Sequence, residues 1–281
     1  MNPLRLLVLL VSLPLLLGGC GGDKKEPVAE VKPVEEKQEI KEEVKPEEPV
    51  AETKPAETVS VSPNLKYETK DDAVTITGCD KKASGALIIP AAIEGKSVTS
   101  IGGYAFVVCE SLTSITIPDS VTSIGYRAFR NCSSLTSITF GKDSKLTSIW
   151  KEAFYGCISL TSITIGDGVT SIGKNAFYYC TSLTSITIPD SVTSIGQSVF
   201  WNCIRLQSIT IGNGVTSIGE EAFYGCSNLT AVTFLGDAPK AGREVFIYAP
   251  PTIYRKPEAK GWGETFEGRP VKLISEKPKT P

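Results

Sequence analysis

The sequence contains no histidine in its 281 residues. Histidine is the commonest general base near neutral pH and the commonest metal ligand, so its absence weighs against both kinds of site. An excess of one charge is also missing, since 29 basic and 31 acidic residues leave a net charge of −2. That balance gives no indication of a nucleic-acid partner. We expect no enzyme, no catalytic residue, no metal, no cofactor and no nucleic-acid binding.

Aromatic residues are absent between positions 21 and 62, where Glu, Lys, Pro, Val and Ala dominate. A segment of this composition buries too little apolar surface to offset the entropy that folding would cost it. We therefore expect a disordered linker over residues 20–62.

The first 19 residues have the pattern of an export signal, in which Arg5 precedes an apolar run from Leu6 to Leu17. That run is too short to span a bilayer as a helix of the mature protein. Leu17-Gly-Gly-Cys20 resembles the lipobox of bacterial lipoproteins, which implies cleavage before Cys20 and attachment of lipid to it. A plain secretory signal with an incidental cysteine is the alternative. Gly21 after the cysteine favours the outer membrane or the cell surface as the destination.

One frame, V-x-x-I-G-x-x-A-F-x-x-C-x-x-L-x-x-I-x-I, recurs along most of the chain. Successive copies are 23 residues apart, except for one step of 25 that contains two extra residues in Gly141–Lys145. A fixed period of this length is typical of a solenoid, in which each repeat is one coil stacked on the last. The copies begin at Val98, Val121, Leu146, Val169, Val192 and Val215.

Each repeat predicts two short extended segments. Ile138 and Phe140 alternate with hydroxyl residues, which is the period of a strand with one buried face. Stacked coils would join such strands into a parallel sheet. Val121 and Ile124 predict a second short strand, and Gly125 then permits a corner.

The rest of the repeat predicts a turn that covers the opposite side of the coil. Ala128, Phe129 and Cys132 lie at one-turn spacing, which indicates a short helical or 3₁₀ turn and hence an α/β class. The phenylalanines of this slot should form one internal column, made of Phe106, Phe129, Phe154, Phe177, Phe200, Phe223 and Phe246.

Sequences at the two ends of the array depart from the frame, as capping coils do when they cover exposed apolar ends. We expect an N-terminal capping coil over 63–97, repeats over 98–236, a C-terminal cap over 237–275 and a loose tail over 276–281. Trp262 and Phe266 are the side chains expected to cover the last coil.

The repeated unit V-T-S-I-G-x-x-A-F-x-x-C-x-S-L-T-S-I-T-I-P resembles the BspA-like leucine-rich repeats of bacterial surface proteins. Gly261-Trp-Gly and Arg269-Pro, which follow the last repeat, resemble a terminal cap of the same family. The resemblance covers about residues 74–275. It implies a right-handed, capped solenoid, a cell-surface location, and adhesion or protein binding without catalysis. The asparagine ladder of other leucine-rich repeats is missing, because Ser120, Gly168, Ser191 and Gly214 lie near that slot. The corner should therefore be made differently.

Six of the eight cysteines occupy the same slot of the repeat. Stacked side chains point the same way, and the Cβ atoms of neighbouring coils would lie farther apart than the 3.5–4.5 Å usual in a disulfide. Zinc is disfavoured because each coil supplies one cysteine and the chain has no histidine. We expect free, buried thiols, at Cys109, Cys132, Cys157, Cys180, Cys203 and Cys226.

The position after each repeat phenylalanine is aromatic in four consecutive coils. If the phenylalanine points inward, its neighbour is at least partly exposed, so these residues predict an aromatic strip. Such a strip could stack on sugar rings, anchor a protein partner, or simply pack on itself. The candidate ligand-binding residues are Tyr155, Tyr178, Tyr179, Trp201 and Tyr224.

The strands carry a regular array of Ser and Thr side chains, which could bind a repetitive polar surface such as ice or be a solvated face. The conclusion from the sequence is a lipid-anchored, non-enzymatic solenoid, expected to be monomeric. Its partner would be a protein, with an envelope glycan as the alternative.

Overall fold

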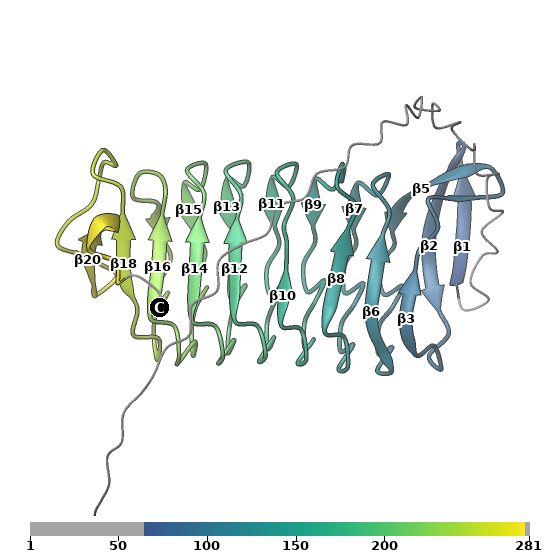
Figure 1. The fold of residues 1–281 in the computed structure, drawn as a ribbon, viewed down its shortest axis with the longest axis horizontal. Helices are drawn as coiled ribbons and strands as arrows, with labels where there is room; N and C mark the ends of the chain where they lie inside the picture. Colours follow the sequence, from purple (N-terminus) through teal and green to yellow (C-terminus); the bar gives the residue numbers. More distant parts are fainter. Residues whose placement is uncertain (1–64, 279–281) are drawn as a thin grey trace, which may run out of the picture. The chain divides into compact units, whose positions relative to one another are not determined.

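The computed structural model describes residues 65–278. The predicted signal peptide, the lipidation of Cys20 and the 20–62 linker therefore lie outside the described residues, as do positions 279–281 of the tail. The described chain begins with an antiparallel pair and continues as stacked coils (Figure 1). The first elements are β1 (Leu65–Lys70), β2 (Ala73–Cys79), β3 (Gly85–Ile88), β4 (Ala92–Ile93) and β5 (Lys96–Ile101).

Each coil contributes one strand to what we call the strand face. These strands begin at the Leu-Thr-Ser-Ile part of the repeat, where apolar and hydroxyl residues alternate with the period of a strand. They are β6 (Leu112–Ile117), β8 (Ser137–Phe140), β10 (Ser162–Ile163), β12 (Ser185–Ile188), β14 (Ser208–Ile211), β16 (Ala231–Phe234) and β18 (Thr252–Arg255).

A second, shorter strand follows in each coil, and in every coil but the last it is the Ser-Ile pair of the repeat. These strands join β1, β2, β4 and β5 in one continuous ten-stranded sheet. They are β7 (Ser123–Ile124), β9 (Ser148–Ile149), β11 (Ser171–Ile172), β13 (Ser194–Ile195), β15 (Ser217–Ile218) and β17 (Lys240–Ala241).

Neighbouring coils pair in parallel and in register. Ile124 is the partner of Ile149 in the shorter strands, and Ile186 is the partner of Ile209 on the strand face. Equivalent residues of successive repeats therefore lie directly beside one another. The predicted stack of coils is confirmed.

The strand face is not continuous. It consists of a sheet in the order β10-β8-β6-β3 and another in the order β12-β14-β16-β18-β20-β19. β10 pairs with β8 over two residues only, and within the described residues it has no ladder with β12. The break comes one coil after the two extra residues in Gly141–Lys145. A surface that must match a long, regular lattice such as ice would be interrupted here.

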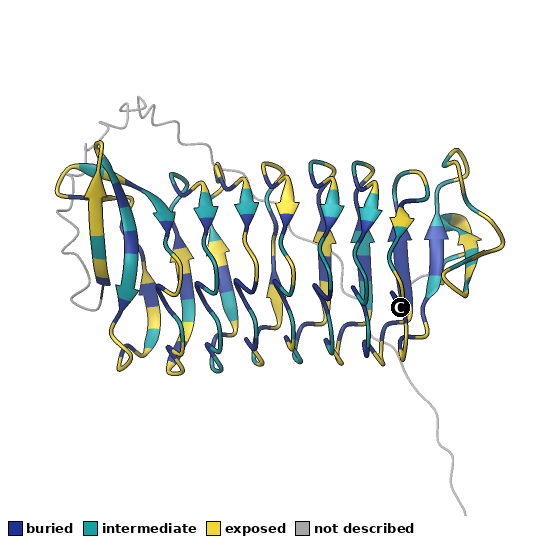
Figure 2. Cartoon of the chain, turned by 180° about the vertical axis from the view of Figure 1, so that it is seen from behind, coloured by how far each residue is buried: buried dark blue, intermediate teal, exposed yellow. Residues whose placement is uncertain are grey.

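The core is a set of parallel columns rather than one central cluster. The seven repeat phenylalanines are no more than 2% exposed. They stack with centroids 4.8–5.5 Å apart and with nearly parallel rings, as the sequence predicts. Figure 2 shows dark blue stretches of buried residues that recur along the stacked coils.

The predicted helical turns, and with them the α/β class, are not found. The 3₁₀ segment η1 (Ile274–Glu276) is the only helical element of the described residues. Ala128, Phe129 and Cys132 lie instead in turns, and the φ of Arg127 just before them is +55°. A right-handed helix requires negative φ throughout, so it cannot pass through that residue.

Hydrogen bonding explains why turns replace a helix at this place. The N–H groups of Ala128 and Arg130 donate to carbonyls three residues earlier in their own coil. The N–H group of Phe129 points the other way and donates to the carbonyl of Ala153 in the next coil, at 2.8 Å. A helix would use all of these donors within its own segment, and the coils would lose these bonds. Residue spacing alone cannot distinguish the two patterns.

Both ends of the stack are covered by atypical elements. β1 runs antiparallel to β2 at the N-terminal end, and β19 (Thr265–Phe266) runs antiparallel to β20 (Arg269–Leu273) at the other end. Trp262 packs 4.9 Å from Phe234 between ring centroids, and Phe266 contacts both Phe234 and Phe246. Trp262 and Phe266 thus cover the last coil, as the sequence predicts.

Where serine occupies the slot before the repeat valine, its hydroxyl makes the corner that leads into the shorter strand. The Ser120 hydroxyl donates to the carbonyl of Val98 at 2.7 Å, and the Ser191 hydroxyl donates to that of Val169 at 2.6 Å. Each bond ties one coil to the preceding one. Hydroxyls therefore link neighbouring coils where other leucine-rich repeats use an asparagine ladder.

Replacing Phe177 with alanine should destabilise the described solenoid by about 3–5 kcal/mol, because it removes a fully buried ring from the middle of the column. Urea denaturation followed by circular dichroism would measure the loss. Thr187→Ala, an exposed change on the strand face, is the control and should cost less than about 1 kcal/mol. Equal losses for the two variants would contradict the column as the main source of stability.

Candidate functional site

The third side of each coil, opposite the strand face, carries the predicted aromatic strip. We call it the turn face and define it as segments 102–109, 125–132, 150–157, 173–180, 196–203, 219–226 and 242–249. Each segment buries the Ala-Phe pair and the cysteine slot, and it turns the residues between them outward. The repeat therefore places the same slots side by side across seven segments.

The structure brings the predicted strip residues into one stack. Tyr155 and Tyr178 have ring centroids 4.8 Å apart, Tyr178 and Trp201 4.6 Å, and Trp201 and Tyr224 5.3 Å. These rings lie within 6° of parallel. The Tyr179 ring packs at a tilt against the rings of both Tyr178 and Trp201, and Tyr179 is 39% exposed. The five candidates are therefore one contiguous group.

The stack determines which part of each ring is available to a ligand. The flat faces of Tyr178 and Trp201 are covered by neighbouring rings, so only the edges of these rings are left for a ligand. Burial, followed by the nearby Tyr155, Tyr179 and Glu221, raises the pKa of Tyr178 to about 12, so its hydroxyl stays protonated. Sugar rings bind aromatic side chains through their flat faces, whereas protein partners also use edges and hydroxyls. The geometry favours a protein over a glycan at this strip.

Two residues that the sequence analysis did not select extend the strip at its ends. The Arg130 guanidinium lies over the ring of Tyr155, 4.3 Å from its centroid. Tyr248, which is 72% exposed, packs edge-on against Tyr224 at 5.3 Å. Arg130 occupies the same slot as the strip aromatics, so comparison of that slot across all seven segments could have found it. Tyr248 occupies the slot of Tyr179.

A buried carboxylate organises the charged end of the turn face. Glu152 is 5% exposed and accepts hydrogen bonds from Arg127 at 2.6 Å and from Arg130 at 2.5 Å. Lys151 lies 3.7 Å from its second oxygen. Burial raises the pKa of Glu152, but the Arg127 bond and the three basic groups together lower it more, so the net pKa is below its ordinary value. The carboxylate therefore stays ionised at neutral pH and fixes both arginines.

Aromatic rings surround the same arginines. The Arg127 guanidinium lies 4.6 Å from the centroid of the Tyr126 ring, which packs edge-on against Tyr104. Arg, Tyr and Trp are the residue types most enriched at the centres of protein interfaces. This end of the turn face thus has the composition of a binding surface.

The other end of the turn face is acidic. Glu220 forms an exposed ion pair with Arg243 at 2.7 Å, and Glu221 accepts a hydrogen bond from Ser198 at 3.0 Å. Glu244 is exposed beside them. The turn face therefore changes sign along the solenoid, from basic near Arg127 to acidic near Glu244.

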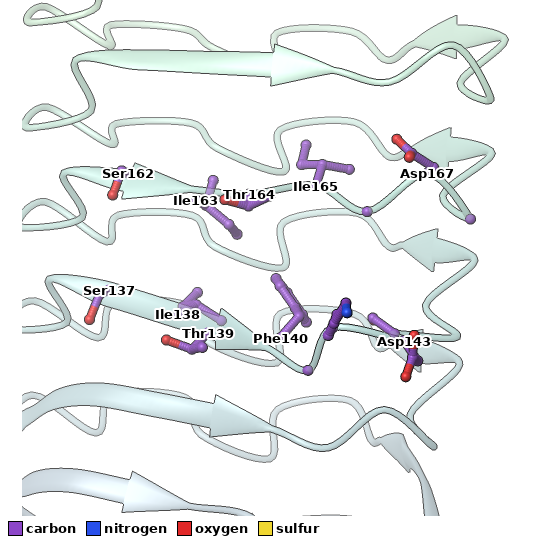
Figure 3. A pocket seen from close by; sticks show the side chains of 15 residues that line it. Ser137, Ile138, Thr139, Phe140, Asp143, Ser162, Ile163, Thr164, Ile165 and Asp167 are labelled. Atoms are coloured by element: carbon purple, nitrogen blue, oxygen red, sulfur yellow. The ribbon is translucent and has the colours of Figure 1, made fainter. Parts of the chain in front are cut away.

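A groove lies on the strand face. It has a volume of about 780 Å³ and lies between the strands of the second and third repeats, where pairing stops after Ile163 (Figure 3). Hydroxyls of Thr139 and Thr164 line it, with Asp143 and Asp167 at one end. It is shallow and open, and it lacks the buried polar groups that orient a small ligand.

The cysteine column is structural. All seven cysteines of the described residues are free and buried, so the prediction of free thiols is confirmed for the six repeat positions. The Cys132 thiol donates to the carbonyl of Phe106 at 3.0 Å, and Cys226 bonds that of Phe200 in the same way. Burial raises the pKa of both thiols to about 12, which leaves little reactive thiolate.

Residues 65–278 contain no group of three or more His, Cys, Asp or Glu side chains placed to hold a metal ion. Over the same residues no helix is long and apolar enough to cross a bilayer.

Replacing Glu152 with glutamine should lower the free energy of unfolding by roughly 1–3 kcal/mol at pH 7, because two arginines lose their charged acceptor. A depressed carboxyl pKa stabilises the fold above the ordinary carboxyl range and stops doing so as pH falls through the lowered value. The stability difference between the wild type and Glu152→Gln should therefore shrink as the pH falls below the ordinary carboxyl range.

Urea denaturation at several pH values would measure this convergence. Glu220→Gln, which removes the exposed partner of Arg243, is the matched control and should cost less than about 1 kcal/mol at any pH. A Glu152→Gln deficit that is the same at pH 7 and in acid would contradict the buried ionised carboxylate.

Comparisons with known proteins can now be set beside this geometry. The sequence model of the BspA type leucine rich repeat region matches residues 89–165 and 147–250, in six copies. No curated protein matches the chain.

Two solved structures are similar over most of the solenoid. A leucine rich repeat protein of T. pallidum is 31% identical with a TM-score of 0.63, and the match covers 67% of this chain and 89% of that one. A leucine rich cell surface protein of Faecalibacterium prausnitzii A2-165 is 33% identical with a TM-score of 0.60, over 69% of this chain and 54% of that one. Since the family's repeats cover more than half of the sequence and their stacked coils are seen in the structure, the chain belongs to the BspA-type leucine-rich repeat family.

Proposed function

We propose that this chain is an exported, lipid-anchored surface protein whose solenoid binds a protein partner without catalysis. The observation that carries the proposal is the turn face, where a stacked aromatic strip adjoins arginines held by a buried carboxylate. Tyr, Trp and Arg in one rigid patch are the usual anchors of protein interfaces. A rigid stack loses little side-chain entropy when a partner binds it.

The absence of a suitable pocket supports binding over catalysis. The strand-face groove is open, and the described residues offer no group of metal ligands. The buried thiols of Cys132 and Cys226 are held protonated, so these two do not supply a nucleophile. Solenoids built from leucine-rich repeats present extended surfaces, and the turn face of this chain is such a surface.

Surface display is supported by the leader of the sequence and by one relative. The Leu17–Cys20 tetrapeptide fits a lipid attachment site, and the related F. prausnitzii protein is described as a cell surface protein. A lipid on Cys20 would hold the chain at a membrane, and the Glu- and Pro-rich segment would separate the solenoid from it.

A photo-crosslinking amino acid placed at position 179 of the full chain, displayed in bacteria, should form covalent adducts with a protein partner. The same amino acid at position 187, which is exposed on the strand face, is the matched control and should form few. Tyr179 is chosen because it is exposed at the edge of the stack, whereas Trp201 lies between two rings and also supports the fold. Adducts from position 187 alone would contradict the turn face as the binding surface.

Metabolic labelling with an alkyne fatty acid tests the anchor. The full chain should incorporate the label and stay with the membrane fraction, and Cys20→Ser should lose both properties because the acceptor thiol is gone. Cys79→Ser, which changes the other cysteine outside the repeat slot, is the control and should label like the wild type. Equal labelling of Cys20→Ser would show that lipid is not attached there.

A further inference from the structure

The charge of the turn face changes sign along the solenoid, from basic to acidic. Its segments from 125 to 180 carry four basic residues and one acidic residue, and its segments from 196 to 249 carry three acidic residues and one basic residue. The basic half contains Arg127, Arg130, Lys151 and Lys174 with Glu152, and the acidic half contains Glu220, Glu221 and Glu244 with Arg243.

Contacts within the chain leave a surplus of charge in both halves. Glu152 is shared by two arginines and Lys151, so one negative charge faces three positive ones. Lys174 lies farther along and donates to the neutral side chain of Gln197 at 2.8 Å. In the other half Arg243 forms an ion pair with Glu220. The carboxylates of Glu221 and Glu244 have no basic partner among the ion pairs of the described residues.

The middle of the turn face is aromatic, and Lys174 is the one charged residue of its two segments, 173–180 and 196–203. Tyr178, Tyr179 and Trp201 lie there in mutual contact. Gln197 and Ser198 are the polar residues beside them, and neither is charged. The basic and acidic halves therefore lie on opposite sides of an aromatic centre.

We propose that the turn face of one chain binds the turn face of a second copy of the same chain, with the two solenoids antiparallel. This inference rests on the proposed role of the turn face in protein binding, and it names the partner. A two-fold axis through the centre brings the basic half of each copy against the acidic half of the other. Such an interface is self-complementary, as isologous interfaces must be.

The coil spacing makes this pairing possible without adjustment. An axis between segments 173–180 and 196–203 places segment 150–157 of one copy opposite 219–226 of the other, and 125–132 opposite 242–249. Lys151 then faces Glu220, and Arg127 faces Glu244. Both copies have the same spacing, because equivalent rings along the stack are 4.6–5.3 Å apart throughout. Tyr179 of each copy would pack at the centre, where aromatic side chains contribute most to binding.

A second copy fits this surface better than a partner of one charge. A uniformly acidic protein would be repelled by the Glu221 and Glu244 end, and a uniformly basic one by the arginine end. Segments 125–132 and 150–157 lie as many coils from the axis on one side as segments 242–249 and 219–226 lie on the other, so a copy of the same surface matches them by symmetry. The dimer replaces the monomer expected from the sequence.

Two charge variants of the full chain test the proposal. One carries Lys151→Glu and Lys174→Glu, so both of its halves become acidic, and the other carries Glu221→Lys and Glu244→Lys, so both become basic. Sedimentation equilibrium at low salt should show a dimer for the wild type at up to about 100 μM, the affinity range of a small interface. Each variant alone should dimerise at least roughly tenfold more weakly, because like charges then face each other.

Mixing the two variants should restore dimers, because the acidic surface of one then meets the basic surface of the other in both halves. Raising the salt should weaken the wild-type dimer and the mixed dimer alike. Circular dichroism melts of the separate variants would check that each one is folded. Recovery on mixing is a result that misfolding cannot produce.

A wild type that stays monomeric at about 100 μM, or variants that dimerise as well as the wild type, would overturn self-association through this face. Failure of the mixed variants to pair would do the same. Crosslinking at position 179 distinguishes a failure of self-association from a failure of the proposed protein binding. Adducts with other proteins but not with the chain itself would retain protein binding and reject the second copy.

Discussion

The backbone hydrogen bonds that join one coil to the next are the constraint on which the rest of the molecule depends. In every turn segment but the last, alternate N–H groups donate to the next coil, as Phe129 does to Ala153 and Phe154 does to Ala176. These bonds hold successive repeats in register, and a helix in the same segment would eliminate them. A single coil has no partner for these groups, so the stack forms as a cooperative array.

Register converts a sequence slot into a physical column. Because each slot lies beside its own copies, a phenylalanine in that slot produces a buried stack of rings, and a cysteine produces a row of thiols that bond the preceding coil. The same rule acts on the outside of the coil. Aromatic residues after the phenylalanine are forced into contact with one another. Tyr178 and Trp201 therefore stabilise the coil stack and also form part of the proposed binding surface.

Function in such an array depends on how the outer slots differ from one coil to the next. The inner slots are nearly uniform, whereas the turn face passes from Arg127 and Arg130 through Trp201 to Glu244. The proposed binding therefore uses a graded surface rather than a pocket, in keeping with the open, shallow groove on the strand face. The charge gradient also gives the surface a direction, which is what an antiparallel pair of copies requires.

The sequence by itself determined the stacked coils, the phenylalanine and cysteine columns, and the aromatic strip, because a period of 23 residues leaves little freedom in how equivalent slots align. Only the tertiary structure decided that the Ala-Phe-x-x-Cys segment is turns instead of a helix. Residue spacing is the same in both, and the choice depends on bonds to the next coil. Tertiary structure also decided that Glu152 binds two arginines and that the strip rings cover one another's faces. Those contacts join residues of different repeats at side-chain distance, which the period of the sequence does not specify.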